Sequence, residues 1–431
     1  MNDPRPSRLR WFLQLRLRTL LILMCILGAV LGLGGNFWRK LQQQRRAIAQ
    51  VEGAGGQIIF VHDFGRYEED DGPIEYRPTS FRKLESGRHE RRRSSPTGPV
   101  IDDDTPPGPA FLRYLLGENA FAIVDTIYFD DKNYSELQPK SLQAFSELRA
   151  LRLSKHQLSN EWLQQAAQLP QLRALSLSPD LNAAPEVNLS LLSRSLSLRH
   201  LGISGRWVSD ETLRDVSHLR QLNSLAISLA PDVSSNILQE LKELEHLQAL
   251  TIIRAHKFDD AKANDFAALQ QLRSLHLVDT SIGEPTLKAV GQLENLESLE
   301  LTHHRLGDNE LKHLADLQRL RHLNLWATDI GDEGVEALSA LKELRLLSLR
   351  YTNITPATLT YISRMRELQS LDLSGLNLED SEELLWQLRP LAKLRRLSVG
   401  PITPESVAVL QKVLPGCEIG STDKSGKQIA P

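Results

Sequence analysis

The chain reads Leu320-Arg-His-Leu323-Asn-Leu325-Trp-Ala-Thr328-Asp-Ile330-Gly-Asp-Glu-Gly-Val335-Glu-Ala-Leu338-Ser-Ala-Leu341, and the same pattern begins again at Leu344. Leucines at offsets 0, 3 and 5 are typical of a short strand with one buried face, because side chains alternate sides along a strand. Val335, Leu338 and Leu341 follow at the spacing of one helix face. One unit of the fold is therefore predicted to be a strand, a turn and a short helix.

The pattern L-x-x-L-x-L recurs through the C-terminal two-thirds of the chain at intervals of 24 to 26 residues. Its copies start at Leu148, Leu172, Leu198, Leu222, Leu247, Leu272, Leu296, Leu320, Leu344, Leu368 and Leu394. Weaker copies flank the run at residues 124–129 and 414–419, as expected for terminal repeats that cap a stack. This period predicts an α/β solenoid of about 12 or 13 repeats over residues 124–420. We expect a curved parallel sheet on its concave side and short helices on its convex side.

Charge and motif content argue against several functional classes. The 431 residues include 51 basic and 54 acidic ones, so no global field would draw the chain to nucleic acid. Two cysteines, Cys25 and Cys417, are too few for a disulfide framework. The patterns G-x-x-x-x-G-K-[ST], H-E-x-x-H, G-x-S-x-G and C-x-x-C are missing, and a solenoid presents a shallow face rather than an enclosed pocket. We therefore expect neither enzymatic activity nor a cofactor.

The N-terminus carries a candidate membrane anchor. Residues 1–18 form a basic segment with five arginines, and residues 19–38 contain no charged side chain. A span of about 20 apolar residues crosses the hydrocarbon core, and Trp11 and Trp38 stand where interfacial aromatics are expected. We predict that residues 19–38 are a retained transmembrane helix of a single-pass membrane protein. A cleaved signal peptide is the alternative, although no A-x-A-like site follows the apolar run.

The orientation of this anchor depends on a small difference in basic residues. Arg39, Lys40, Arg45 and Arg46 on one side nearly balance the five arginines on the other. The positive-inside rule then favours a cytoplasmic N-terminus and an extracytoplasmic repeat domain.

Between the anchor and the repeats we expect three further segments. Residues 39–62 are predicted to form a juxtamembrane helix and a short strand. Residues 63–109 are rich in charge and proline, so we predict a disordered linker that holds the repeats away from the membrane. Residues 110–123 are predicted to form a helix that caps the N-terminal edge of the solenoid. A disordered tail is expected over residues 421–431.

The turns and helix starts also carry polar residues at regular positions. The turn reads Thr-x-Ile in the best copies, as at Thr328 and Thr352. We expect its hydroxyl to bond the backbone of neighbouring coils. Asp308, Asp332 and Ser381 lie near the starts of the predicted helices and are candidate helix caps.

The repeat L-x-x-L-x-L-x-x-T-x-I-x-D-x-x-L-x-x-L-x-x-L resembles the leucine-rich-repeat superfamily, in particular its cysteine-containing type, with Thr in the Cys position. The whole chain resembles bacterial single-pass membrane-anchored leucine-rich-repeat proteins. The residues that carry this second likeness are Arg18-Thr-Leu-Leu, Ala54-Gly-Gly56, Pro106-Pro-Gly-Pro-Ala-Phe-Leu-Arg113, Leu116-Gly-Glu118 and Leu414-Pro-Gly-Cys-Glu-Ile419. The resemblance implies a curved binding surface for proteins and supplies no ligand.

Offsets 2, 4 and 6 of each repeat are expected to face the concave side. From Leu272 onward this surface becomes rich in His, Trp, Tyr and Arg, the composition of a protein-binding hot spot. The candidate site residues are His276, Glu300, His303, His322, Asn324, Trp326, Arg350, Tyr351, Asp372 and Arg396. We predict that this patch binds a protein partner. The alternative is that these are solvated strand residues without a ligand.

The sequence bears on three other functional interpretations: a metal site, a self-associating scaffold and a regulatory subunit. His276, Glu300, His303 and His322 would suit a metal ion if they converged, but they belong to different rows, so we predict no metal site. A structural scaffold of the cell envelope that acts through self-association is the alternative function. A regulatory subunit of a cytoplasmic enzyme would require the reverse orientation.

Overall fold

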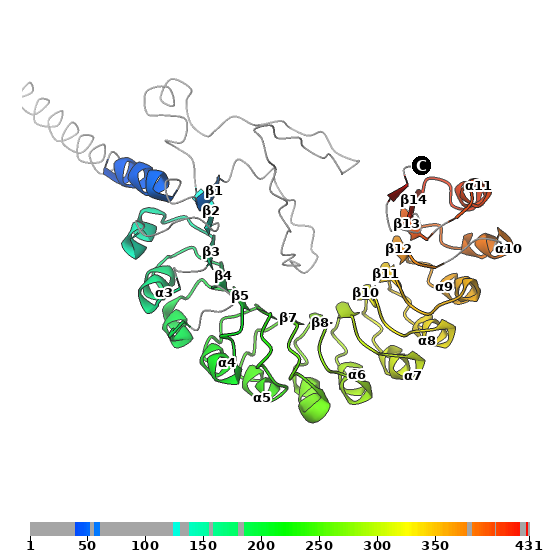
Figure 1. Cartoon of the computed structure of the whole chain (residues 1–431), viewed down its shortest axis with the longest axis horizontal. Helices are drawn as coiled ribbons and strands as arrows, with labels where there is room; N and C mark the ends of the chain where they lie inside the picture. The colour runs from blue at the N-terminus through cyan, green and yellow to red at the C-terminus, as the bar shows by residue number, and fades with distance from the viewer. Residues whose placement is uncertain are drawn as a thin grey trace, which may run out of the picture.

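The computed structural model describes residues 39–51, 56–60, 124–129, 138–154, 158–179, 185–376, 382–400, 402–422 and 428–429. The chain forms a horseshoe whose inner curve is a continuous sheet and whose outer curve carries the helices (Figure 1). Strands follow one another in the sheet in chain order, from β1 to β15. The predicted solenoid, with a concave sheet and convex short helices, is confirmed.

The strands and helices are short throughout. The strands are β1 Gly56–Phe60, β2 Val124–Phe129, β3 Ala150–Ser154, β4 Ala174–Ser178, β5 His200–Ser204, β6 Ser224–Ser228, β7 Ala249–Ile253, β8 Ser274–Val278, β9 Ser298–Thr302, β10 His322–Asn324, β11 Leu346–Ser348, β12 Ser370–Leu373, β13 Arg396–Val399, β14 Glu418–Thr422 and β15 Gln428–Ile429. The α-helices are a helix over residues 39–51 and α3 Asn160–Ala167, α4 Asp210–Val216, α5 Ile237–Leu241, α6 Glu284–Val290, α7 Asp308–Leu311, α8 Asp332–Leu338, α9 Leu359–Ile362, α10 Glu382–Leu385 and α11 Pro404–Val413. The 3₁₀ helices are η3 Pro139–Ala144, η5 Leu189–Arg194, η6 Asp260–Ala268, η7 Lys312–Leu314, η8 Pro356–Thr358 and η9 Trp386–Leu388.

Each strand pairs with its neighbour so that residues at the same position of successive repeats lie side by side. Leu323 pairs with Leu299 on one side and with Leu347 on the other, and β2 to β14 are parallel. Equal positions of successive repeats therefore form continuous rows across the concave face. The antiparallel pairs β1–β2 and β14–β15 end the sheet on its two sides.

The leucines of the repeat form one core. Leu320, Leu323 and Leu325 are fully buried, and their counterparts in other coils join the same cluster. Burial of a leucine side chain contributes roughly 1.5–3 kcal/mol, so a stack of such coils is stable only when neighbours cover each other.

The N-terminal edge is covered by residues 39–60, and this corrects the predicted arrangement. Ala47, Ile48 and Val51 of the helix over residues 39–51 enter the common core, and Ser141 Oγ donates to Gln50 Oε1 at 2.9 Å. In Figure 1 this helix lies beside the first coil. β1 pairs with β2, so residues 61–123 join two neighbouring strands. The interpretation of residues 63–109 as a spacer is therefore wrong, because the chain is already packed against the sheet before that segment begins.

The other N-terminal predictions concern residues that the structure does not describe. The basic segment 1–18, the predicted span 19–38, the disorder predicted for residues 63–109 and the capping helix 110–123 all lie outside the described residues. Within the described part of the chain, no helix combines the length and apolarity needed to cross a bilayer. At the other end, the predicted disordered tail 421–431 is corrected in part. Its first residues complete β14, and β15 pairs with them.

The polar residues of the turns also act differently from the prediction. Thr328 Oγ1 and Thr352 Oγ1 each donate a 2.7 Å bond to a carbonyl three residues earlier in the same coil, not to a neighbouring coil. Asp308 and Asp332 lie in the first turns of their helices, but their carboxylates accept backbone N–H groups of the next coil. Ser381 lies outside the described residues. The aspartates are long enough to reach across, and each turn places its N–H groups toward the preceding coil.

Candidate functional site

Four of the predicted site residues form a stacked cluster at the ends of β9 to β11. The His303 and Trp326 rings meet edge to face, with centroids 4.7 Å apart. The Arg350 guanidinium lies 5.7 Å from the Trp326 ring centroid and 4.9 Å from that of Tyr351. Trp326 is 37% exposed and Tyr351 is 51% exposed. We call these four residues the aromatic–arginine cluster.

The backbone beneath the cluster adopts an uncommon conformation that the sequence reading missed. Residues at offset 7, within three residues of the end of the strand, have positive φ in every repeat from Leu198 to Leu368. They are Gly205, Leu229, Arg254, Asp279, His303, Ala327, Tyr351 and Gly375. From Gly205 to Tyr351 their N–H groups donate to the next coil, as from Ala327 to the Arg350 carbonyl at 2.9 Å. For a residue other than glycine this conformation costs roughly 1–2 kcal/mol.

This row of positive φ fixes the placement of His303 and Tyr351. Both residues follow directly on offset 6, where Thr302 and Arg350 stand, so the turn brings an offset 7 side chain beside the concave row. The glycines at 205 and 375 were the available signal, because glycine favours this region. Tyr351 also packs over Gly375, where an added Cβ would lie 2.8 Å from Tyr351 Cδ1.

A second group of predicted residues forms a polar row across β8, β9 and β10. His276 Nδ1 lies 3.6 Å from Glu300 Oε2, and Asn324 Nδ2 donates to Glu300 Oε1 at 3.3 Å. Asn324 Oδ1 accepts the backbone N–H of Trp326 at 3.2 Å. The polar row therefore continues into the aromatic–arginine cluster and positions the backbone of its central residue.

The remaining predicted residues are not joined to the cluster. Asp372 Oδ1 accepts the backbone N–H of Ser374 at 2.9 Å, and Arg396 Nε lies 3.5 Å from Glu418 Oε2 on an exposed edge. In the described part of the chain, no hydrogen bond or ion pair links Asp372 or Arg396 to Arg350. His322 is half-buried in β10.

The residues considered for a metal ion do not converge. His276 contacts Glu300, whereas His303 stacks on Trp326. Over the described ranges, no group of three or more His, Cys, Asp or Glu side chains is arranged to hold a metal ion.

The neighbour of His303 is a buried histidine that the sequence reading did not single out. His304 is 4% exposed, and its Nε2 lies 2.9 Å from Thr280 Oγ1 and accepts the Thr280 backbone N–H at 3.3 Å. Burial lowers the pKa of His304 to about 4. The imidazole is therefore neutral at neutral pH and serves as an acceptor for the turn of the preceding coil.

The comparison with protein families matches this architecture. A family model described as a leucine rich repeat covers residues 317–339, within and around the unit that begins at Leu320. Residues 317–339 therefore match a leucine rich repeat, and the described coils have the leucine-rich-repeat fold. Its parallel register and buried leucines follow that repeat from coil to coil.

Solved leucine-rich-repeat structures resemble this one at low identity. A Listeria monocytogenes internalin crystal structure is 17% identical, with coverage of 74% of this chain and 94% of that chain and a TM-score of 0.48. A leucine-rich-repeat protein of Leptospira interrogans is 18% identical, with coverage of 66% and 92% and a TM-score of 0.37. A comparison with curated proteins finds no match. These identities transfer no ligand to the present chain.

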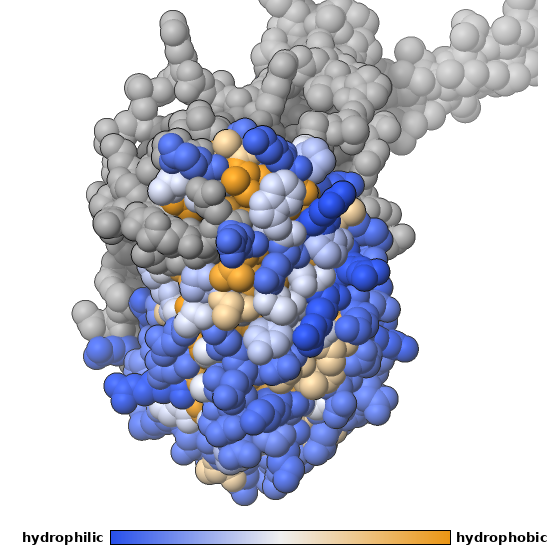
Figure 2. All heavy atoms as spheres, turned by 90° about the vertical axis from the view of Figure 1, so that its right-hand side faces the viewer, coloured by the Kyte–Doolittle hydropathy of each residue, from blue (hydrophilic) through white to orange (hydrophobic). Residues whose placement is uncertain are grey.

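The surface of the solenoid is largely polar at its C-terminal end. On the coloured part of the face in Figure 2, hydrophilic residues predominate and apolar residues occur in small separate patches. Broad apolar patches usually mark hydrophobic interfaces. No broad apolar patch of that kind is visible on the coloured part of this face.

Proposed function

We propose that this leucine-rich-repeat protein recognises a protein partner through the aromatic–arginine cluster and has no catalytic role. The placement of the Arg350 guanidinium against two exposed aromatic rings is the observation that carries this proposal. Trp, Tyr and Arg dominate protein-binding hot spots, and a guanidinium held over an aromatic ring can still donate N–H groups to carboxylate or carbonyl oxygens.

The rigidity of the cluster supports the same proposal. Trp326 and Arg350 lie two residues beyond β10 and β11, which are hydrogen-bonded on both sides. Tyr351 is held by a 3.0 Å bond from its N–H to the Ser374 carbonyl. Side chains that are already ordered lose less entropy on binding, which leaves more of the contact energy for affinity.

The test uses a photo-crosslinking residue at Tyr351 in the full chain within its native cells. The control carries the same residue at Glu336, which is exposed on the convex helix α8. We expect a defined partner to crosslink at 351 and not at 336, and Trp326→Ala with Arg350→Ala to weaken its binding at least tenfold. An unchanged affinity of the double variant for the partner would contradict the proposal that the aromatic–arginine cluster is the binding site. Crosslinks only between copies of this chain would favour the self-associating scaffold instead.

We also propose that residues 19–38 anchor the protein in a membrane and that the repeats lie outside the cytoplasm. The uncharged run and its basic flanks support the anchor. Because the helix over residues 39–51 packs on the first coil, the solenoid would then begin at the bilayer surface. Resistance to alkaline extraction tests the anchor, and a C-terminal reporter that is active only in the cytoplasm would contradict the orientation.

A further inference from the structure

A second row of side chains runs along the starts of the strands. The residue at offset 1, directly after the first leucine of each repeat, is arginine in seven of the eleven copies. These are Arg149, Arg173, Arg199, Arg273, Arg321, Arg345 and Arg395, which we call the arginine row. The carbonyl at this position accepts two N–H groups of the next coil, as Arg149 does from Arg173 and Ala174 at 2.8 and 2.9 Å. Members on neighbouring coils therefore stand about 4.8 Å apart.

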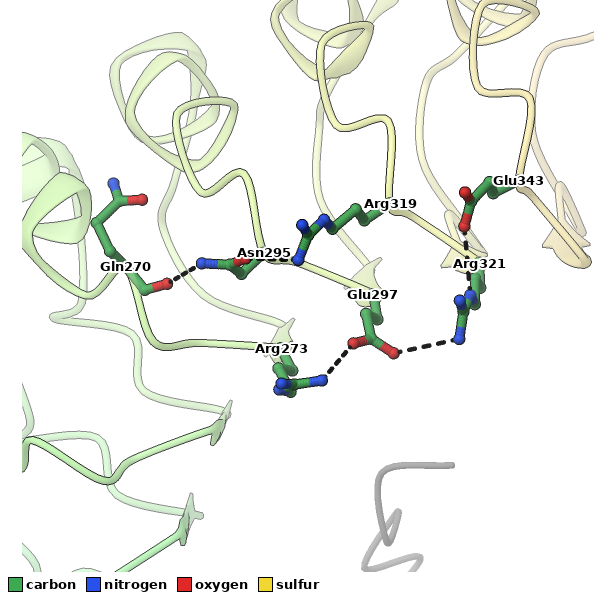
Figure 3. A network of polar contacts seen from close by, with 7 residues as sticks. All are labelled: Gln270, Arg273, Asn295, Glu297, Arg319, Arg321 and Glu343. Atoms are coloured by element: carbon green, nitrogen blue, oxygen red, sulfur yellow. Dashed lines mark hydrogen bonds and ion pairs between the residues drawn. The ribbon is translucent and has the colours of Figure 1, made fainter. Parts of the chain in front are cut away.

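The protein itself contains an example of what this row binds. Glu297 occupies offset 1 between Arg273 and Arg321 (Figure 3). Arg273 Nη1 lies 2.8 Å from Glu297 Oε1, and Arg321 Nη1 lies 3.6 Å from Glu297 Oε2. The Glu297 side chain is only 14% exposed. A carboxylate placed in this row is thus held by arginines of both flanking coils.

Toward the N-terminal end of the row, Arg173 and Arg199 stand on neighbouring coils with no acidic member between them. Among the described residues, neither Arg173 nor Arg199 forms an ion pair. Arg199 Nη1 donates to two backbone carbonyls at 2.9 and 3.0 Å, which fixes its guanidinium in place. Burial, followed by the charges of Arg173 and Arg199, lowers the pKa of the adjacent His200. Positive charge therefore accumulates at this end of the row.

The concave surface beside these arginines is lined by small side chains. Ala174, Gly202, Ser224 and Ala226 surround a shallow hollow next to His200. Small side chains let the backbone of another chain approach the sheet closely, whereas a flat bilayer does not enter a concave face. An extended polypeptide fits this surface, and glutamates two residues apart in it are separated by about 6.8 Å, within reach of arginines on neighbouring coils.

We propose that Arg173 and Arg199 bind the carboxylates of an extended acidic segment of a partner protein, which lies across the small side chains of β4 to β6. The bonds are of the kind that Glu297 makes within the chain. This surface is distinct from the aromatic–arginine cluster, which lies at the opposite ends of strands farther along the chain, and it does not depend on the function proposed for that cluster.

The test measures fluorescence anisotropy of a labelled ten-residue peptide of alternating glutamate and serine, added to the full chain at low salt. We expect Arg173→Gln with Arg199→Gln to weaken binding about tenfold, and added salt to weaken binding to the unsubstituted chain. The matched control is Arg214→Gln with Arg220→Gln. It removes the same charge, but from ion pairs with Glu240 and Glu243. The control is expected to bind as the unsubstituted chain does.

A second variant keeps the test sharp if the double variant folds poorly. Arg173→Glu places a carboxylate between Arg149 and Arg199, which copies the native arrangement around Glu297. We expect an unchanged melting temperature and loss of peptide binding. Equal binding by Arg173→Glu and the unsubstituted chain would overturn the proposal.

The same titration distinguishes other occupants of the row. The chain could bind phosphatidylglycerol vesicles and not the peptide. If Arg173→Glu abolished that vesicle binding, the proposal of a polypeptide ligand would be overturned. In a further variant, the acidic residues 68–71 and 102–104 are replaced by the corresponding amides. Peptide binding by this variant alone would mean that the chain's own acidic runs occupy the arginine row, and it would overturn the proposal of a partner protein. Tight binding of the peptide by the chain with its acidic runs intact supports the proposal.

Discussion

The Asp308 carboxylate accepts a 2.7 Å hydrogen bond from the backbone N–H of Gly331, one coil farther along the chain. The same relationship joins Asp260 to the N–H of Gly283 at 3.1 Å. Each such aspartate lies in the first turn of its own helix and satisfies a turn of the next coil. The convex side is therefore coupled from coil to coil, in addition to the hydrogen bonds of the sheet.

Asp308→Ala is expected to destabilise the solenoid. It removes a charged acceptor from a half-buried backbone N–H, and such a loss costs about 1–3 kcal/mol. The measurement is a denaturant titration combined with hydrogen exchange at Gly331, where protection should fall most. Asp316→Ala, at an exposed position outside this network, is the control and should change stability by less than about 0.5 kcal/mol. Equal effects of the two substitutions would contradict the coupling.

The row of positive φ predicts a substitution that stabilises. Ala327 has φ of 57°, so Ala327→Gly removes a conformational cost of roughly 1–2 kcal/mol, against a loss of about 0.5–1 kcal/mol from greater freedom when unfolded. We expect a small net gain in the melting temperature. Ala337→Gly, inside helix α8, is the matched control and should cost about 1 kcal/mol. A lower melting temperature for Ala327→Gly would show that the row is unstrained.

The buried His304 predicts a loss of stability in mild acid. Burial lowers its pKa from 6.5 to about 4, so the unfolded chain binds this proton at a higher pH than the folded one does. Stability from this group is complete above pH 6.5 and falls as the pH approaches 4, by about 2 kcal/mol between pH 7.5 and 5. Denaturant titrations at both pH values should show a smaller difference for His304→Gln, which retains an acceptor for Thr280. An identical difference in the two proteins would contradict the assignment.

The sequence predicted the parts of the fold that depend on periodicity. The positions of Leu320, Leu323 and Leu325 define which side of each coil is buried, and the parallel register follows because every copy has nearly the same length. The reach of Asp308 into the next coil was not predictable in this way. An aspartate near the start of a helix can either cap its own helix or accept an N–H group of the next coil. The distance between coils decides which of these two hydrogen bonds forms, and the sequence does not give that distance.

The sequence predicted the candidate site residues as one patch on the concave face, whereas in the structure they form smaller separate groups of contacting side chains. Offsets 4 and 6 gave Glu300, Asn324, Trp326 and Arg350 their shared surface. The place of Tyr351 beside Arg350 depends on a positive φ, which leucine periodicity does not encode. The arginine row was missed because alternation assigns offset 1 to the interior, whereas the chain at the start of a strand has not yet entered the sheet.

The position of the helix over residues 39–51 gives the last prediction. The sequence predicts a helix here without indicating what it contacts, and in the structure Val51 of this helix is fully buried in the common core. Val51→Asp buries an unpaired carboxylate, which costs several kcal/mol, so the helix should detach from the first coil. Ala49→Asp, at an exposed position of the same helix, introduces the same charge and should leave the packing intact. Hydrogen exchange in β2 and β3 measures the difference, because these strands lose their cover only in the first variant. Full protection of both strands in Val51→Asp would mean that the helix contributes nothing to the N-terminal edge, and the solenoid would then begin at β1.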